Sequence, residues 1–210
     1  MKPGFAAPVI AILLVMMTAC AKSDTAGREP SVSVDPVLKE RAAKDAAFKA
    51  EDSPILPEDR PGFKGLDYYP LDPGLRFTVR LQRYSSPQQV RLGTNTGEIR
   101  SGLRYGFFSF QIGNQECRLQ AYRLDDAPAG GPYLFIPFRD STSGRETYGS
   151  GRYIDLKENT SGIYDLDFNR ASNPYCAYNP TFSCPIPPDE NSLKVAIRAG
   201  EKKYRPSRGH

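Results

Sequence analysis

The stretch from residue 138 to residue 191 concentrates the polar side chains whose chemistry suits a binding or catalytic site. Most of these groups stand at the end of an apolar segment, where strand ends could bring them to one rim. Polar groups of this kind are costly to bury without partners, so they bind either one another or a ligand. The candidate rim consists of Arg139, Asp140, Arg152, Tyr153, Asp155, Asp167, Asn169, Glu190 and Asn191.

Three kinds of chemistry fit this rim. Arginine clamps an anionic group through two parallel hydrogen bonds, and asparagine both donates and accepts, so the rim could bind a polar ligand. Its acidic residues, with carbonyl oxygens, could hold a hard cation. Two of the carboxylates could instead divide the acid and base roles of a glycosidase-like hydrolase. The carboxylates in question are Asp140, Asp155, Asp167 and Glu190.

A structural interpretation accounts for the same residues. Pairs of arginine and aspartate commonly fix loops at strand ends, and asparagine caps turns through its side chain. Arg139 with Asp167, or Arg152 with Asp140, would be natural ion pairs. The sequence does not choose between a site and an ion-pair network, because both have the same composition, but the structural interpretation is favoured.

Several common mechanisms are disfavoured by the residues that the chain carries. The only histidine, His210, is the last residue, which argues against a Ser-His-Asp or Cys-His arrangement and against a histidine-rich zinc site. The sequence contains no Walker loop or dinucleotide fingerprint, and nothing in it resembles a nucleic-acid-binding module. We therefore predict no cofactor, no bound metal and no nucleic-acid partner.

The N-terminal residues resemble the signal peptide of a bacterial lipoprotein. A single charge, Lys2, precedes an apolar run over residues 5–17, which is shorter than the roughly 20 residues that a spanning helix needs. The run ends in Met-Thr-Ala-Cys, which is similar to a lipobox. We expect residues 1–19 to be removed and Cys20 to carry the acyl chains that hold the protein to membrane lipid. The alternatives are an ordinary secretory signal cut after Ala19 and an uncleaved anchor.

The lipoprotein interpretation places the mature chain in the cell envelope, at the outer membrane if the cell has two. Residues 20–34 are small, polar and charged, which is typical of a flexible tether. Asp35 is a suitable N-cap for one short helix over residues 35–52, with Pro36 in its first turn. The remainder, residues 53–210, is predicted to be a single β-rich domain.

From residue 76 onward, short alternating apolar segments are separated by turn residues, a pattern that predicts strands. Eight strands at this spacing, without long helices between them, indicate an all-β fold. We expect mainly an antiparallel sandwich or a partly open barrel, with the one short N-terminal helix beside it. The predicted strands cover residues 77–84, 89–92, 105–112, 118–124, 133–138, 151–156, 163–168 and 192–199.

Three of the four cysteines remain once Cys20 is assigned to lipid. Cys176 and Cys184 bracket a short proline-containing loop, and an oxidising compartment favours a disulfide between them. Cys117 is then left as a buried small apolar residue. The formal net charge is +4, with the excess in the C-terminal residues, which we interpret as a solvated end of the chain.

Uncommon residue strings occur in one order between about Phe63 and Tyr204. They resemble a bacterial family catalogued as domain of unknown function 1684, in a shorter form with an added helix and lipid signal. The resemblance implies one structural unit and brings no known activity with it. The strings are FIPFRD (135–140), TSG (142–144), ETY (146–148), GRY (151–153), DFN (167–169), NPYCAY (173–178), CP (184–185), PP (187–188), EN (190–191) and AGEK (199–202).

The sequence therefore supports two hypotheses for function. The leading one is a cell-envelope lipoprotein that is not an enzyme, whose β domain binds a ligand, an envelope polymer or a protein partner through the rim. The alternative is a carboxylate-dependent hydrolase that acts on an envelope glycan or a related polymer.

Overall fold

The computed structural model describes residues 1, 4, 35–126 and 132–205. Val34–His210 form a compact unit, to which all the elements below belong. The predicted signal peptide, Cys20 and the predicted tether lie outside the described residues. Within the described ranges, no helix has the length and apolar character required to cross a membrane.

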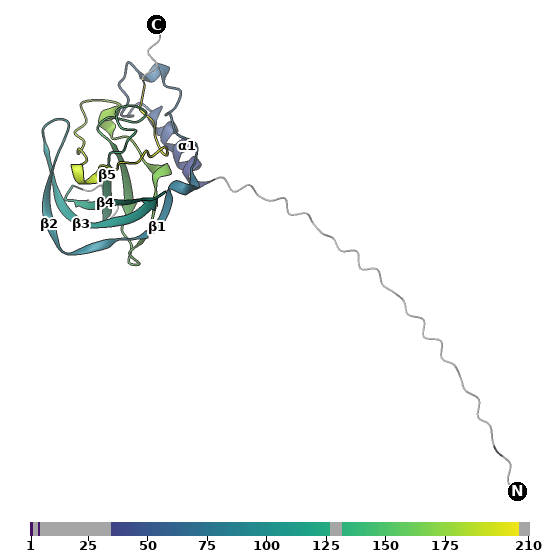
Figure 1. The fold of residues 1–210 in the computed structure, drawn as a ribbon. Coiled ribbons are helices and arrows are strands. Elements are labelled where there is room, and N and C mark those ends of the chain that lie inside the picture. The colour runs from purple at the N-terminus through teal and green to yellow at the C-terminus, as the bar shows by residue number, and fades with distance from the viewer. Residues whose placement is uncertain (2–3, 5–34, 127–131, 206–210) are drawn as a thin grey trace. The chain divides into compact units, whose positions relative to one another are not determined.

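Five strands form an antiparallel sheet in the order β2-β3-β4-β5-β6, and Figure 1 shows β2 to β5 next to one another. Strands β3 and β4 form a long hairpin whose register runs to the pair Ile112 and Gln115. Gly113 takes a φ of 57° in the hairpin turn, a conformation that glycine adopts without steric cost. The strands are β2 (Gln82–Gly93), β3 (Ile99–Ile112), β4 (Gln115–Leu124), β5 (Tyr133–Phe138) and β6 (Arg152–Lys157).

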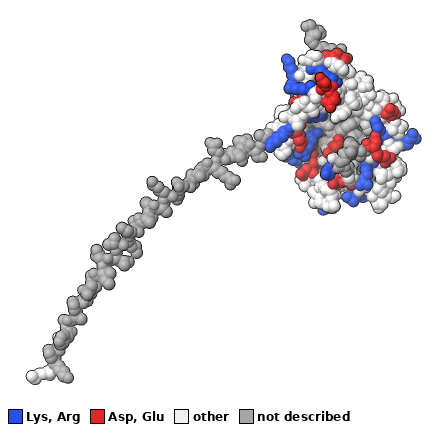
Figure 2. Space-filling view, turned by 180° about the vertical axis from the view of Figure 1, so that it is seen from behind, with Lys and Arg blue, Asp and Glu red and all other residues white. Residues whose placement is uncertain are grey.

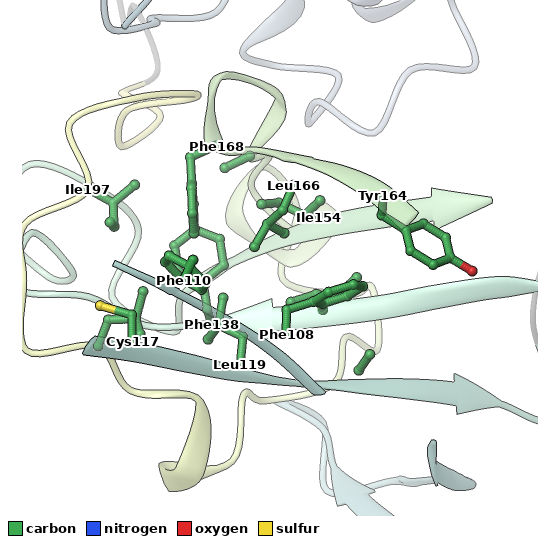
Figure 3. Packing of buried hydrophobic residues seen from close by; sticks show 14 of the residues in the cluster. Phe108, Phe110, Cys117, Leu119, Phe138, Ile154, Tyr164, Leu166, Phe168 and Ile197 are labelled. Atoms are coloured by element: carbon green, nitrogen blue, oxygen red, sulfur yellow. The ribbon is translucent and has the colours of Figure 1, made fainter. Parts of the chain in front are cut away.

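A second, two-stranded sheet pairs β1 (Arg76–Arg80) with β7 (Ile163–Asp167) in antiparallel register. The main apolar core contains side chains from both sheets, such as Tyr164 on β7, whose ring centroid lies 5.5 Å from that of Phe108 on β3. Both sheets are antiparallel, which confirms the predicted all-β class. The strands of the described residues do not close into a barrel. Figure 3 shows part of this core, with Phe108, Phe110, Cys117, Leu119, Phe138, Ile154, Tyr164, Leu166, Phe168 and Ile197 labelled.

Helix α1 (Pro36–Phe48) lies on the opposite side of the unit from β2 (Figure 1). It begins where expected, because the Asp35 side chain accepts a hydrogen bond of 2.9 Å from the backbone N–H of Val37. It ends at Phe48, where Lys49 and then Ala50 donate to carbonyls three residues back. Short 3₁₀ turns occur at η1 (Arg60–Gly62), η2 (Pro73–Leu75), η3 (Phe168–Arg170), η4 (Tyr175–Ala177) and η5 (Asp189–Asn191).

The predicted strand over residues 192–199 is wrong. Leu193 and Ile197 are buried as their alternation suggested, yet the segment pairs with no strand beyond a single bridge from Ser192 to Arg139. The carbonyl of Ile197 instead accepts a hydrogen bond from the buried guanidinium of Arg152. The backbone of Leu193 and Val195 bonds that of Arg139 and Ser141, so the segment is paired partly by an irregular loop and partly by a side chain.

Candidate functional site

Asp140 and Arg152 form a buried ion pair in the core of the domain. The Arg152 guanidinium donates to Oδ2 of Asp140 at 2.9 Å, and the two side chains are 0% and 1% exposed. Arg152 also donates to the carbonyls of Ile197, Ala199 and Glu201. Burial lowers the pKa of the Arg152 guanidinium, and the nearby Asp140 carboxylate opposes that shift. This pair holds the C-terminal segment against β6.

Asp140 fixes its own loop as well. Its Oδ1 accepts from the backbone N–H of Thr142 at 2.8 Å, from the Thr142 hydroxyl, and from the N–H of Ile197 at 3.2 Å. A carboxylate with this many donors has little remaining capacity to bind a ligand. We therefore assign Asp140 and Arg152 a structural role.

Asp167 and Asn169 also serve the fold. Oδ1 of Asp167 accepts from the backbone N–H and the side chain of Asn169, and Oδ2 accepts from Arg76 Nε at 2.9 Å. The Asn169 amide bonds both the N–H and the carbonyl of Asp72, at 2.8 and 2.9 Å. These bonds join the end of β7 to the turn that precedes β1.

Asn191, Glu190 and Arg139 tie the turn at η5 to the sheet. The buried amide of Asn191 bonds the N–H and carbonyl of Gln120 on β4 and the carbonyl of Pro137 on β5. Glu190 accepts from the Tyr122 hydroxyl at 2.6 Å and from Arg104. Arg139 donates to Asp189 at 2.8 Å. Of the two predicted ion pairs, Arg152 with Asp140 is present, whereas Arg139 and Asp167 have other partners.

Asp155 differs from the other acidic residues of the predicted rim. Its side chain makes no hydrogen bond or salt bridge with any described residue. It projects from β6 into a cavity of about 500 Å³, a volume typical of small-molecule sites. Tyr153, two residues earlier on the same strand, lines this cavity too and donates its hydroxyl to the carbonyl of Pro185.

The cavity beside Asp155 has aromatic side chains among its walls. Helix α1 contributes Lys44, Ala47 and Phe48, and the segments 172–175 and 182–184 complete the lining with β6. The rings of Tyr175 and Phe182 meet edge to face with centroids 5.3 Å apart. Both are exposed large hydrophobic residues, 50% and 36% accessible. The site thus presents apolar surface that is not used in the core.

A second cavity of about 240 Å³ adjoins the first, because Asp155 and Ser183 line both. Its walls include Leu124, Phe135 and the guanidinium of Arg100. We call the two cavities together the Asp155 groove. The carboxylate therefore stands at the junction of a longer groove with apolar walls on each side.

Charges around the groove are balanced except at Asp155. Lys44 forms a salt bridge with the buried Glu201, and Arg100 forms one with Asp126. Asp155 is exposed to solvent, although many protein atoms lie near its carboxylate. This partial desolvation raises its pKa to about 6, against a weaker opposing attraction from Lys44.

The expected disulfide between Cys176 and Cys184 is not formed, and both residues are free thiols. The Cys184 sulfur instead accepts a hydrogen bond of 3.2 Å from the backbone N–H of Cys176. The Cys176 thiol and this N–H stabilise the Cys184 thiolate and lower its pKa. Cys117 is buried within the main core, where desolvation raises its pKa.

No group of three cysteine, histidine, aspartate or glutamate side chains gathers as metal ligands within the described part of the chain. Of the four carboxylates considered for a hard cation, Asp140, Asp167 and Glu190 lie in separate hydrogen-bond networks, and Asp155 lines the groove. On the face shown in Figure 2, acidic and basic side chains are interspersed. Among the described residues, that face therefore shows no large patch of a single charge that would indicate a binding surface.

The fold and the site define an antiparallel β domain with a ligand-sized groove between its helix and its sheet. Residues 61–202 match a family model described as "Protein of unknown function (DUF1684)". This match covers more than half of the sequence, and the chain belongs to that family. Helix α1, which lines the groove, precedes the matched residues.

An uncharacterized protein of Haloarcula marismortui, whose solution NMR structure is known, is similar to this chain. The two are 37% identical over 79% of this chain and 91% of that one, with a TM-score of 0.63. No curated protein sequence matched the chain.

Sequence reasoning placed Asp155 and Tyr153 among the candidates but missed the rest of the groove. Its walls come from α1, β3, β5 and the loop around Phe182, which are distant in the sequence. The one local signal for it is the run of aromatic residues Tyr175, Tyr178 and Phe182. In the structure both ends of that run are exposed.

Proposed function

We propose that this protein is a ligand-binding β domain of the cell envelope, held on a membrane by a lipidated Cys20. The observation that supports binding is the Asp155 groove, in which an unpaired carboxylate lies between two cavities with apolar walls. A concave site that combines aromatic rings with a few polar side chains is typical of small-molecule recognition. The support for the anchor is the lipobox-like sequence that ends at Cys20.

Binding is favoured over hydrolysis by the state of the carboxylates. A glycosidase-type mechanism needs two carboxyl groups that face one cleft. Asp140 and Asp167 are buried and paired with arginine, and Glu190 is bonded to Tyr122 and Arg104. Asp155 alone of the four stands in the groove without a bonded partner.

A fluorescence experiment tests the groove directly. N-phenyl-1-naphthylamine is an uncharged apolar dye that brightens in a dry aromatic site. We expect it to bind the wild-type protein and to be excluded by Ala47→Trp, which fills the larger cavity from an exposed position on α1. Ala42→Trp, also at an exposed position of α1 but outside the groove lining, is the matched control and should bind the dye normally.

Equal dye binding by both tryptophan variants would place the dye elsewhere and refute the groove as the site. Circular dichroism of each variant ensures that a loss of binding does not come from unfolding. Since the wild-type chain contains no tryptophan, the indole emission of each variant also reports whether its new side chain is enclosed.

The anchor is tested by cell fractionation. Cys20→Ser removes the thiol that would accept the lipid, so the protein should move from the membrane fraction to the soluble fraction. Mass spectrometry of the wild-type protein should find acyl chains on a new N-terminus at Cys20. An unmodified N-terminus would refute the lipid anchor and leave the proposal for the groove untouched.

A further inference from the structure

We propose that the ligand of the Asp155 groove carries a positively charged nitrogen group between two apolar parts. This inference rests on the proposed function, because it assigns a ligand class to the same groove. The position of Asp155 at the junction of the two cavities is what divides the ligand into a central cation and two flanking apolar arms.

The first argument is charge balance within the groove. Its two cationic side chains are already neutralised, Lys44 by Glu201 and Arg100 by Asp126. The Asp155 carboxylate has no bonded partner among the described residues. When a ligand displaces water from this exposed carboxylate, the carboxylate needs an opposite charge or a hydrogen-bond donor. A ligand cation would supply both, whereas an anionic ligand would be repelled.

The second argument is the nature of the walls. The larger cavity contains the rings of Phe48, Tyr175 and Phe182, and the smaller contains those of Tyr133 and Phe135. Aromatic faces attract cations and also accept flat apolar groups. The walls therefore suit the arms of such a ligand, and they strengthen rather than oppose the attraction of its charged centre to Asp155.

Every charged or titratable group that faces Asp155 affects the pH dependence of this interaction. Lys44 projects from α1 and Arg100 from β3, while Asp126 follows β4. Tyr153 lies on the same strand, and burial raises its pKa far from neutrality. Cys184 lines the larger cavity, and its lowered pKa makes it a second group that can titrate near neutral pH.

The inference can be tested with two matched ligands. N-benzylphenethylamine is protonated at neutral pH and has an aryl arm on each side of its nitrogen; benzyl phenethyl ether has the same shape without the charge. Isothermal titration at pH 7.5 should show the amine binding wild-type protein at least about 10-fold more tightly than the ether, equivalent to about 1.4 kcal/mol. Asp155→Asn should remove that advantage and leave ether binding unchanged.

The pH profile provides a second readout. Protonation of Asp155 below a pKa of about 6 should weaken amine binding by about 5-fold or more between pH 7.5 and pH 5, and leave ether binding constant. Cys184→Ser changes a lining residue and can alter the affinity itself, but the weakening of amine binding between pH 7.5 and pH 5 should persist, because the thiol is not the group responsible. A profile that disappears in Cys184→Ser would assign the effect to the thiol and overturn the inference.

The outcomes separate this inference from the proposed function. If the dye and the ether bind but the amine gains nothing from Asp155, the cationic ligand class is wrong and the groove remains a binding site. If neither the dye nor either matched ligand binds the wild-type protein, the groove itself is refuted as a site.

Discussion

Two aspartates of this chain show how surroundings decide the role of a residue. Asp140 is buried, receives four hydrogen bonds and neutralises Arg152, so its charge stabilises the fold and is not accessible to a ligand. Asp155 lies only 15 residues further along and meets no donor from the described residues. The difference arises because Asp140 enters the core with an arginine, whereas Asp155 points into the groove.

Asp140→Asn should destabilise the protein strongly. The substitution nearly preserves volume but leaves the buried Arg152 guanidinium without its counter-charge, which costs about 3–5 kcal/mol when one partner of a buried pair is removed. Urea denaturation followed by circular dichroism measures the change. Asp189→Asn, which removes the exposed partner of Arg139, is the control and should cost less than about 1 kcal/mol. A stable Asp140→Asn protein would contradict the structural role.

Asp155→Asn, in contrast to Asp140→Asn, should stabilise the folded protein at neutral pH. The folded protein holds the Asp155 proton up to a pKa of about 6, above the ordinary value in the unfolded chain. Between about pH 4 and pH 6 the folded state therefore binds more protons, and the free energy of unfolding falls as pH rises. Removing the carboxylate should raise stability above pH 6 and change little near pH 4.

Paired urea titrations at pH 7.5 and pH 4 provide the measurement for Asp155. Asp52→Asn, at an exposed position outside the groove lining, is the control and should show no such pH-dependent gain. A loss of stability at pH 7.5 would mean that Asp155 has a stabilising partner and is not a residue reserved for a ligand. Residues that bind a ligand often lower the stability of the protein when the ligand is absent.

The residue types of the candidate rim could be identified from the sequence, but their environments could not. The pair of Arg152 with Asp140 was one of two natural couples, separated by only 12 residues. The pairing of Asp167 with Arg76 spans 91 residues and depends on the register between β1 and β7. No local pattern encodes that register, so the predicted pairing of Arg139 with Asp167 was wrong.

At the scale of elements, periodicity predicted burial better than hydrogen bonding. The segment 192–199 buries its alternating apolar side chains as a strand would, but the carbonyls of Ile197 and Ala199 bond the Arg152 side chain. Alternation of apolar and polar residues predicts which side chains are buried, but it does not predict which groups form hydrogen bonds with the backbone. For the same reason, the sequence predicted one strand over residues 77–84. The structure has two strands there, β1 and β2, separated by the buried Leu81.

Helix α1 contacts the domain along its length, through the buried Val37 and the hydrogen bonds of Arg41 near its start and through Phe48 at its end. Phe48 is buried in a second apolar cluster with Ile55, Leu66 and Tyr178, and its ring meets that of Tyr178 edge to face at 4.9 Å. Lys44, one turn earlier, bonds the buried Glu201. This cluster therefore fixes the end of the helix that forms a wall of the groove.

Phe48→Ala should loosen α1 more than it loosens the sheet. Truncating a buried phenylalanine costs about 3–5 kcal/mol in a well-packed site. Hydrogen exchange should accelerate in the amides of α1 and much less in those of β3, and dye binding should weaken because one wall of the groove moves. Leu38→Ala, at an exposed position of the same helix, should change stability by less than about 0.5 kcal/mol. Uniform acceleration across the sheet would contradict local docking.

At the scale of the whole molecule, the groove is a product of chain topology. Its walls combine α1, strands of the five-stranded sheet and the loops before residue 186, all brought together by long-range packing. The fold class was accessible from short strands and turn residues because these are local signals. A groove shared among distant segments is not a local signal, and only Asp155 and Tyr153 of it were among the sequence-based candidates.

The same topology makes a prediction about truncated chains. A protein that begins at Val34 keeps the whole compact unit, so its urea midpoint and its dye affinity should equal those of the full chain. A protein that begins at Glu51 lacks α1, which leaves the buried Glu201 without Lys44 and removes Phe48 from its cluster. Its midpoint should fall and dye binding should be lost, although the family-matched residues 61–202 are all present. If the shorter protein bound the dye as well as the longer one, α1 would not be a wall of the site, and the groove would have to be reassigned to the smaller cavity alone.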